Sequence, residues 1–399
     1  MALGIVLALA YVFFLRTPPP APAPTVTRVQ GTYVFEGQTE LRSWKENGAF
    51  GAVAGGNAAG RKESTVTRAG SSAHLGATLS SGYDARLRSE LTASMRPGGP
   101  SSYSRVVGAW PPVWQVATRS PLDYQGLAAI VRSAVEDGDR TIGIKPLKDG
   151  DRKVWRADIT FGDSNVELVV DQLTGIVVWC SRSNSLGRET FTATVDWTAA
   201  APSSAAFVIH LPPDAKVETS RDGAYHYRPT LAATGVTVGS TPLESTLEPD
   251  GYTLRAVAVA WLDQAPLALL SGSAPLPPGI PHPTPDNEVA QLYTRGLTWF
   301  SIQQVAARGT PRFAALSRRA VDLYASRGLS ARTEVLQYGA LAGAVAHTWY
   351  AEDGPALYVA DDKYAVTVRG GLTRQELISL AQGLQPLGSG GSASPSPSP

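Results

Sequence analysis

The sequence predicts an α+β protein in which antiparallel β-sheets dominate and a few helices pack on them. Two observations support this class: four strand-like segments follow one another at residues 152–197, and helices with clear start and stop signals lie outside them. The turns between the four segments are only a few residues long. Parallel strands need a crossover of a dozen or more residues, so the segments are expected to pair as an antiparallel meander.

The four segments of the meander are recognised by the spacing of their apolar residues: residues 153–161, 166–171, 176–180 and 190–197. The first and fourth alternate apolar and polar side chains, which is typical of a strand with one buried face. The second and third are apolar at nearly every position, which predicts burial on both faces. Turn-forming residues separate the segments at 162–165, 172–175 and 184–187. The single cysteine, Cys180, is expected to be a small buried hydrophobic residue.

The chain before the meander is β-rich, with strands predicted at residues 26–35, 40–45, 64–68 and 85–93 and glycine-rich turns at 48–60, 70–72 and 98–100. One helix, predicted over residues 122–136, interrupts it. Ser120 is its expected N-cap, Pro121 takes the first helical position and Gly138 ends it. Two Asp-Gly-Asp-Arg sequences, 137–140 and 149–152, are interpreted as hairpin turns, because neither continues into a calcium-binding loop.

The second half of the chain predicts a smaller mixed domain. Strands are expected at residues 253–262, 332–337, 342–350, 356–359 and 363–369, with a hairpin at 288–305 that turns at Arg295-Gly296. One helix is predicted to begin at Thr310. The final helix has the clearest signals, since Thr373 and Glu376 form a capping box and Leu372 and Leu377 fit a hydrophobic staple. The Ser/Gly/Pro tail after it has nothing to bury and is expected to be disordered.

Composition excludes several classes of function. A net charge of +1 gives no field that would attract nucleic acid. The five histidines are scattered without a ligand partner at helical spacing, so neither zinc nor another metal is predicted. No Gly-x-Ser-x-Gly elbow occurs, and the phosphate-loop lysine is missing. The prediction is a protein that is not an enzyme and has no cofactor, although a hydrolase built from distant residues stays open.

The N-terminus carries an apolar run of fourteen residues, 2–15. As a helix it would span about 21 Å, less than the roughly 30 Å of a hydrocarbon core. A membrane anchor is favoured over a cleaved signal peptide, since Pro24 follows the one small-x-small sequence. Residues 17–24 then form a stiff proline-rich spacer. The prediction is a single-pass protein of the cell membrane, with the bulk of the chain extracytoplasmic.

Six of the nine tryptophans lie in the first half of the chain. An ordinary sandwich core would explain them, and so would an open, curved sheet with a concave apolar face plugged by the helix at 122–136. In the second case an acyl chain could lie in the cavity and gain about 0.8 kcal/mol per buried methylene. The candidate lining residues come from the meander and the helix: Trp155, Ile159, Phe161, Val169, Trp179, Phe191, Val195, Leu127, Ile130 and Val131.

Residues 154–182, with the sequence Asp171-Gln172-Leu173-Thr174-Gly175 between two apolar strands, resemble the strand-Asp-x-x-Thr-Gly-strand segment of LolA-like lipoprotein carriers. The two-domain periplasmic regulators of the RseB/MucB family share that segment. Residues 250–254, the hairpin at 289–305 and the ending at 364–384 look like the smaller domain of the same family. The likeness covers roughly residues 25–387 and depends on short motifs.

The resemblance implies a LolA-like antiparallel half-barrel with a helix plug, followed by a smaller α+β domain. The implied division is an anchor or signal segment (1–16), a spacer (17–24), the half-barrel (25–217), a linker (218–248), the C-terminal domain (249–387) and the tail (388–399). It also implies a sensor that binds a lipid or lipoprotein acyl chain and regulates a membrane anti-sigma factor in the envelope stress response. The alternative is a protein–protein interaction module, the extracytoplasmic part of an anti-sigma factor, without a lipid site.

Overall fold

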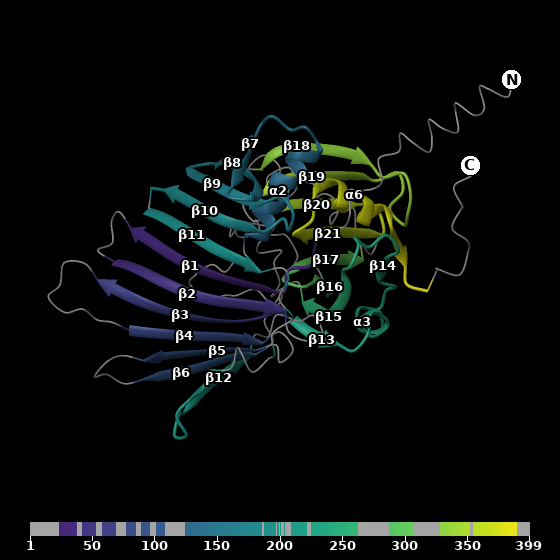
Figure 1. The fold of residues 1–399 in the computed structure, drawn as a ribbon. Coiled ribbons are helices and arrows are strands. Elements are labelled where there is room, and N and C mark those ends of the chain that lie inside the picture. The colour runs from purple at the N-terminus through teal and green to yellow at the C-terminus, as the bar shows by residue number, and fades with distance from the viewer. Residues whose placement is uncertain are drawn as a thin grey trace, which may run out of the picture.

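The structure is a computed structural model that describes residues 24–37, 42–52, 58–68, 77–84, 89–95, 101–107, 124–185, 187–196, 198, 200, 203, 209–221, 225–261, 287–306, 328–351 and 354–388. Two large, mostly antiparallel sheets and a short ladder account for nearly all of its regular structure, and three helices accompany them in these ranges (Figure 1). The predicted α+β class is confirmed.

The first sheet has twelve strands in the order β12-β6-β5-β4-β3-β2-β1-β11-β10-β9-β8-β7. Their bounds are β1 Arg28–Gly37, β2 Arg42–Ala52, β3 Ala58–Arg68, β4 Ala77–Asp84, β5 Ser89–Met95, β6 Ser102–Val107, β7 Gly143–Asp149, β8 Arg152–Phe161, β9 Ser164–Asp171, β10 Val177–Asn184, β11 Gly187–Asp196 and β12 Val217–Arg221. β1 pairs with both β2 and β11, which joins the N-terminal strands to the meander. β12 pairs with β6 in parallel.

The predicted meander is confirmed as β8 to β11, with antiparallel pairing throughout. The Asp-x-x-Thr-Gly sequence is the turn between β9 and β10. One carboxylate oxygen of Asp171 accepts hydrogen bonds from the Leu173 and Thr174 backbone N–H groups and from the Thr174 hydroxyl. Gly175 completes the turn at φ +67°, where a side chain would be strained. In this chain the motif therefore holds two strands in register.

Two sequence expectations about the first sheet are corrected. Residues 48–60 were expected to form a glycine-rich turn, but residues 48–52 belong to β2 and 58–60 to β3. Ladder hydrogen bonds use backbone groups that glycine also has, so pairing on both sides overrides the weak strand preference of glycine. The sequence at 137–140 is not a hairpin turn, since Asp137 is the C-cap of a helix. The second Asp-Gly-Asp-Arg sequence does turn the β7–β8 hairpin.

The second sheet has eight strands in the order β13-β15-β16-β17-β21-β20-β19-β18. Their bounds are β13 Tyr225–Arg228, β15 Thr253–Trp261, β16 Asn287–Arg295, β17 Thr298–Ala306, β18 Leu329–Val335, β19 Val345–Ala351, β20 Gly354–Ala360 and β21 Tyr364–Gly370. β14 (Leu243–Ser245) and β22 (Leu384–Pro386) form the separate two-stranded ladder. The predicted hairpin at Arg295-Gly296 is confirmed. Residues 218–248, expected as a linker, hold most of β12 together with β13, α3 and β14.

The three helices are α2 (Gln125–Glu136), α3 (Leu231–Val238) and α6 (Arg374–Gln382). α6 has the predicted capping box between Thr373 and Glu376. α3, which the sequence analysis missed, packs on β15 and β16. The expected helix start at Ser120, the helix from Thr310, the segment at 1–16 and residues 389–399 of the tail lie outside the described residues. α2 contacts β10 of the first sheet and β20 of the second, so it joins the two sheets (Figure 1).

Candidate functional site at the helix between the sheets

The apolar side of α2 covers the core face of the meander. Leu127, Ile130 and Val131 share one buried cluster with Ile159, Phe161, Phe191 and Val195. Trp155 and Val169 are partly buried and pack against this cluster. Nine of the ten predicted lining residues are thus brought together. Ile130, Val131 and Phe191 have 0% of their surface exposed, so neighbouring protein atoms cover them completely.

The remaining predicted lining residue, Trp179, is not part of this cluster. Trp179 is the register partner of Val169, whereas Cys180 is the partner of both Leu168 and Phe191. Directly paired residues share a face and successive residues alternate between faces. Trp179 therefore does not share the face of Phe191. The sequence could not assign these faces because β9 and β10 are apolar at nearly every position.

The beginning of α2 is fixed by an aromatic residue. Tyr124 is the N-cap and makes no side-chain cap hydrogen bond. Its hydroxyl donates to a Glu189 carboxylate oxygen at 2.7 Å, and its ring lies 5.1 Å from the Phe191 ring. The helix start is thereby held to β11.

The polar side of α2 is bound to the second sheet, to the segment before α6 and to the first residue of α6. The Gln125 side-chain oxygen accepts from the Trp299 backbone N–H at 2.9 Å. An Arg132 Nη2 donates to the Gly371 carbonyl at 2.6 Å, and the Ser133 hydroxyl accepts from the Arg374 backbone N–H at 2.5 Å. These contacts join residues more than 170 positions apart in the sequence.

The backbones of α2 and β20 also approach closely. A Cβ placed on Gly354 would lie 2.6 Å from the Gly126 Cα, and Gly354 has φ +130°. Both observations mean that only glycine fits this position. α2 therefore packs directly against the first residue of β20 in the second sheet.

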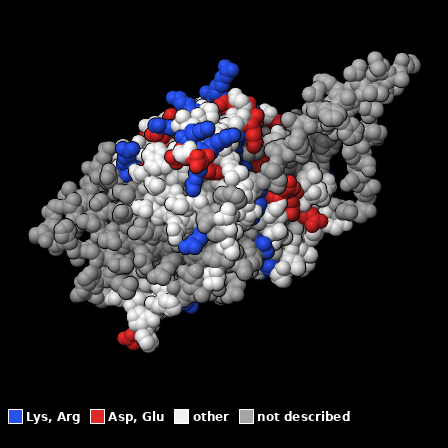
Figure 2. All heavy atoms as spheres, viewed as in Figure 1, with Lys and Arg blue, Asp and Glu red and all other residues white. Residues whose placement is uncertain are grey.

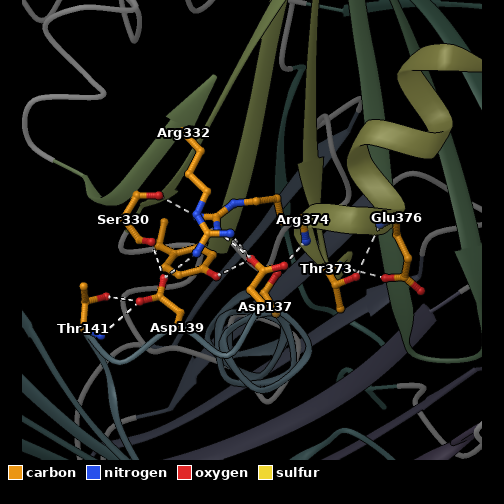
Figure 3. A network of polar contacts seen from close by, with 10 residues as sticks. Asp137, Asp139, Thr141, Ser330, Arg332, Thr373, Arg374 and Glu376 are labelled. Carbon is orange, nitrogen blue, oxygen red and sulfur yellow. Dashed lines mark hydrogen bonds and ion pairs between the residues drawn. The ribbon is translucent and has the colours of Figure 1, made fainter. Parts of the chain in front are cut away.

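A charged network closes the C-terminal end of α2 (Figure 3). Arg374 Nη1 and Arg332 Nη1 lie 2.6 and 3.3 Å from Oδ2 of Asp137. Arg374 Nη2 donates to the Ser330 carbonyl at 2.6 Å, and the Ser330 hydroxyl donates to Asp139. Thr141 also donates to Asp139 through its backbone N–H and its hydroxyl. The network thus joins the end of α2 to β18 and α6.

Arg374 is the central cation of this network, and only 7% of its side chain is exposed. Its guanidinium carbon lies 4.4 Å from the centroid of the Tyr350 ring. Burial raises the pKa of the Tyr350 hydroxyl to about 12. Ser330, whose carbonyl Arg374 binds, has φ +52° and is the one non-glycine residue with positive φ in the described ranges. Such a conformation persists only where surrounding contacts determine it.

Two carboxyl groups of the junction have pKa values shifted in opposite directions. Desolvation raises the pKa of Glu136, and hydrogen bonding from Thr373 and the charge of Arg132 offset this only in part. Desolvation alone would also raise the pKa of Asp139. The hydrogen bonds from Ser330 and Thr141 and the charge of Arg332 outweigh desolvation and lower that pKa. Asp139 is therefore held ionised by its partners.

No local sequence pattern predicts the charged network. The pattern at 373–376 predicts only the start of the final helix, and the one at 137–140 predicts only a turn. The available signal was indirect: an arginine at the first position of a helix is unfavourable for the helix dipole, and a carboxylate partner elsewhere would offset that cost.

The described residues contain no group of three His, Cys, Asp or Glu side chains placed to hold a metal ion. They also include no helix that is both long and apolar enough to cross a bilayer. Lys and Arg side chains are mixed with Asp and Glu over the part of the surface where Figure 1 places β7, β8 and β18 (Figure 2). The junction links an apolar face on the first sheet to polar contacts on the second sheet.

No family model matches this chain, and no curated protein matches it by sequence. Among solved structures, the chain is similar to MucB in complex with MucA(peri), with a TM-score of 0.26, 14% identity, and coverage of 90% of this chain and 93% of that chain. It is similar to the MucA/MucB complex of Pseudomonas aeruginosa with a TM-score of 0.26, 15% identity and the same coverage. A β-barrel-like protein of unknown function from Brucella abortus matches 44% of this chain and 98% of its own, with 9% identity and a TM-score of 0.26.

The family that the sequence resembles, RseB/MucB, is thus also found among the similar solved structures. TM-scores of 0.26 mean that the whole chains superpose poorly.

Proposed function

We propose that this chain is a non-catalytic sensor of the cell envelope, which binds a lipid or lipoprotein acyl chain and regulates a membrane anti-sigma factor. In this proposal residues 1–16 hold it at the membrane, residues 25–217 act as a LolA-like half-barrel, and α2 is the plug. The observation that carries the proposal is the two-sided attachment of α2. Its apolar side lies on the meander, and its polar side is bound to the second sheet.

This attachment gives a route for a signal between the two sheets. The meander face beneath α2 is already filled by Leu127, Ile130 and Val131. An acyl chain that binds there must displace the helix. Since Gln125, Arg132 and Ser133 are bonded to the second sheet, to the segment before α6 and to the first residue of α6, displacement of the helix would change those contacts as well. A partner bound to the second sheet would then respond to acyl-chain binding.

The free energy gained by burying an acyl chain is large enough to offset the cost of displacing α2. Removing the three apolar side chains of α2 from the core would cost about 6 kcal/mol, at roughly 2 kcal/mol each. Burial of a sixteen-carbon chain returns on the order of 10 kcal/mol at about 0.8 kcal/mol per methylene, before ordering costs. The two quantities are close enough for a ligand to shift the position of the helix.

The test is native mass spectrometry of the purified chain released from detergent, with and without added palmitoyl lipid. The proposal expects an adduct of the mass of the lipid. It also expects a larger adduct fraction for Arg374→Ala, which loosens the polar side of α2. Arg156→Ala is the matched control, because Arg156 pairs with Glu167 on an exposed part of β8. A bare protein mass under all conditions would count against the lipid site.

A second candidate function is a protein–protein interaction module without a lipid site. The complete coverage of Ile130, Val131 and Phe191 favours it, since these side chains leave no surface for a ligand while α2 stays in place. The two candidates differ in one measurement. Capture of an anti-sigma factor that is unchanged by palmitoyl lipid would support the module, and capture that the lipid weakens would support the sensor.

A further inference from the structure

The two large sheets have four edge strands, and three of them carry features that discourage pairing with another chain. β12 and β13 are only five and four residues long. β7 is longer but contains Lys145, Pro146 and Lys148. Short length, proline and lysine are the usual means by which proteins protect a sheet edge from edge-to-edge association.

β18 has none of these three features, although its pairing with β19 shifts register between Leu329 and Arg332. It is seven residues long, has neither proline nor lysine, and is exposed at every position from Ala331 to Val335. β19 occupies one side of it, and the sheet ends on the other. The backbone groups on that free side have no strand partner in the described part of the chain. Val335 and its register partner Val345 are 48% and 44% exposed, so an apolar surface lies beside this edge.

The sequence of β18 is complementary to itself in one antiparallel register. When Thr333 lies opposite Thr333 of a second copy, each Arg332 faces a Glu334 and each Ala331 faces a Val335. Directly opposite residues share a face, so opposite charges and Thr–Thr pairs in these positions stabilise the pair. Centring the pair on Arg332 or on Glu334 instead would place like charges opposite each other.

Glu334 and Arg332 are exposed enough to form these charge pairs with a second copy. Glu334 has no ion pair within the described ranges, and its side of the strand is exposed. Arg332 is 45% exposed and contacts Asp137 and Asp139 at 3.3 and 3.8 Å. Its guanidinium has five donors, so it can donate to a further carboxylate without leaving the junction.

We propose that two copies of this chain pair antiparallel along β18, centred on Thr333, and join their second sheets into one continuous sheet. The pairing is isologous, so the same residues serve on both copies. It does not depend on the sensor function, because no residue beneath α2 takes part in it.

The experiment is disulfide trapping in the full-length chain. In the proposed register the Cα atoms of Thr333 and its counterpart lie about 4.5–5.5 Å apart, within the range that a disulfide spans. Thr333→Cys is therefore expected to give a covalent dimer on a non-reducing gel under mild oxidation. Val335→Cys is the matched control, since two such residues would lie four positions apart along the strands, roughly 13 Å, and cannot bridge. The native Cys180 is buried and contributes little background.

The second arm tests the charge pairs. Glu334→Arg in the Thr333→Cys background places arginines opposite each other twice and is expected to slow trapping at least about tenfold. Melting temperatures of all variants show whether they fold. The proposal is overturned if folded Thr333→Cys stays monomeric, if Val335→Cys crosslinks equally well, or if Glu334→Arg changes nothing. Equal crosslinking at both positions would indicate association through another part of the chain.

Discussion

The two sides of α2 contact the protein in different ways. The side that faces the meander is apolar, and its contacts with Phe161, Phe191 and their neighbours have no required direction. The side that faces the second sheet depends on directed bonds, such as that between Arg374 and Asp137. Apolar contacts have no preferred angle, whereas the directed bonds fix one position. The comparison suggests that the polar side sets where α2 sits and the apolar side sets how tightly it is held.

The largest effect is expected on the polar side, from Arg374→Ala. The substitution leaves Asp137 without its closest cation and removes the donor to the Ser330 carbonyl. Breaking a buried ion pair by removing one partner costs about 3–5 kcal/mol. Urea unfolding at neutral pH should show a loss of this size. Arg332→Ala is the matched comparison, since Arg332 contacts the same carboxylate at 3.3 Å but is 45% exposed, and about 1 kcal/mol is expected. Equal losses of unfolding free energy in the two variants would contradict the conclusion that Arg374 is the central cation of the network.

The difference between the apolar and the polar side of α2 also explains which contacts could be predicted from the sequence. Leu127, Ile130 and Val131 repeat at helical spacing, so the apolar side of α2 could be found from periodicity alone. The meander, the β16–β17 hairpin and the capping box of α6 are local patterns and were predicted for the same reason. Each depends on residues that are close in the chain.

The polar side depends on residues that are far apart in the chain. Arg374 and Asp137 are separated by 237 positions, and Gln125 and Trp299 by 174. No spacing rule connects such pairs, and an isolated aspartate in a Gly-rich segment also fits an ordinary turn. The face of Trp179 could not be predicted for a related reason. In a strand without alternation, the face is decided by the register of its neighbours.

The next effect in size is expected on the apolar side, from Ile130→Ala. Ile130 is fully buried between α2 and the meander, and such truncations cost about 2–5 kcal/mol through lost burial and the cavity left behind. Val135→Ala, on the same helix but 41% exposed, should cost well under 1 kcal/mol. Urea unfolding at low and high salt sharpens the comparison. The cost of Ile130→Ala should not depend on salt, whereas a strong salt dependence would mean that polar contacts move with this side chain.

The smallest effect concerns the two carboxyl groups with opposite pKa shifts. The pKa of Asp139 is lowered in the folded chain, so its ionised form adds stability above its ordinary value of 3.8, and that stability is lost as the pH falls through the folded-state pKa. Asp139→Asn should therefore destabilise the protein by about 1 kcal/mol at pH 7 and by less below pH 4. The pKa of Glu136 is raised, so its ionised form is disfavoured at neutral pH, and Glu136→Gln should be neutral or stabilising there. The measurement is the pH dependence of the free energy of unfolding for both variants. A loss of stability in Glu136→Gln at pH 7, or a constant cost of Asp139→Asn down to pH 3, would show that the carboxylates do not act on the junction through their charge.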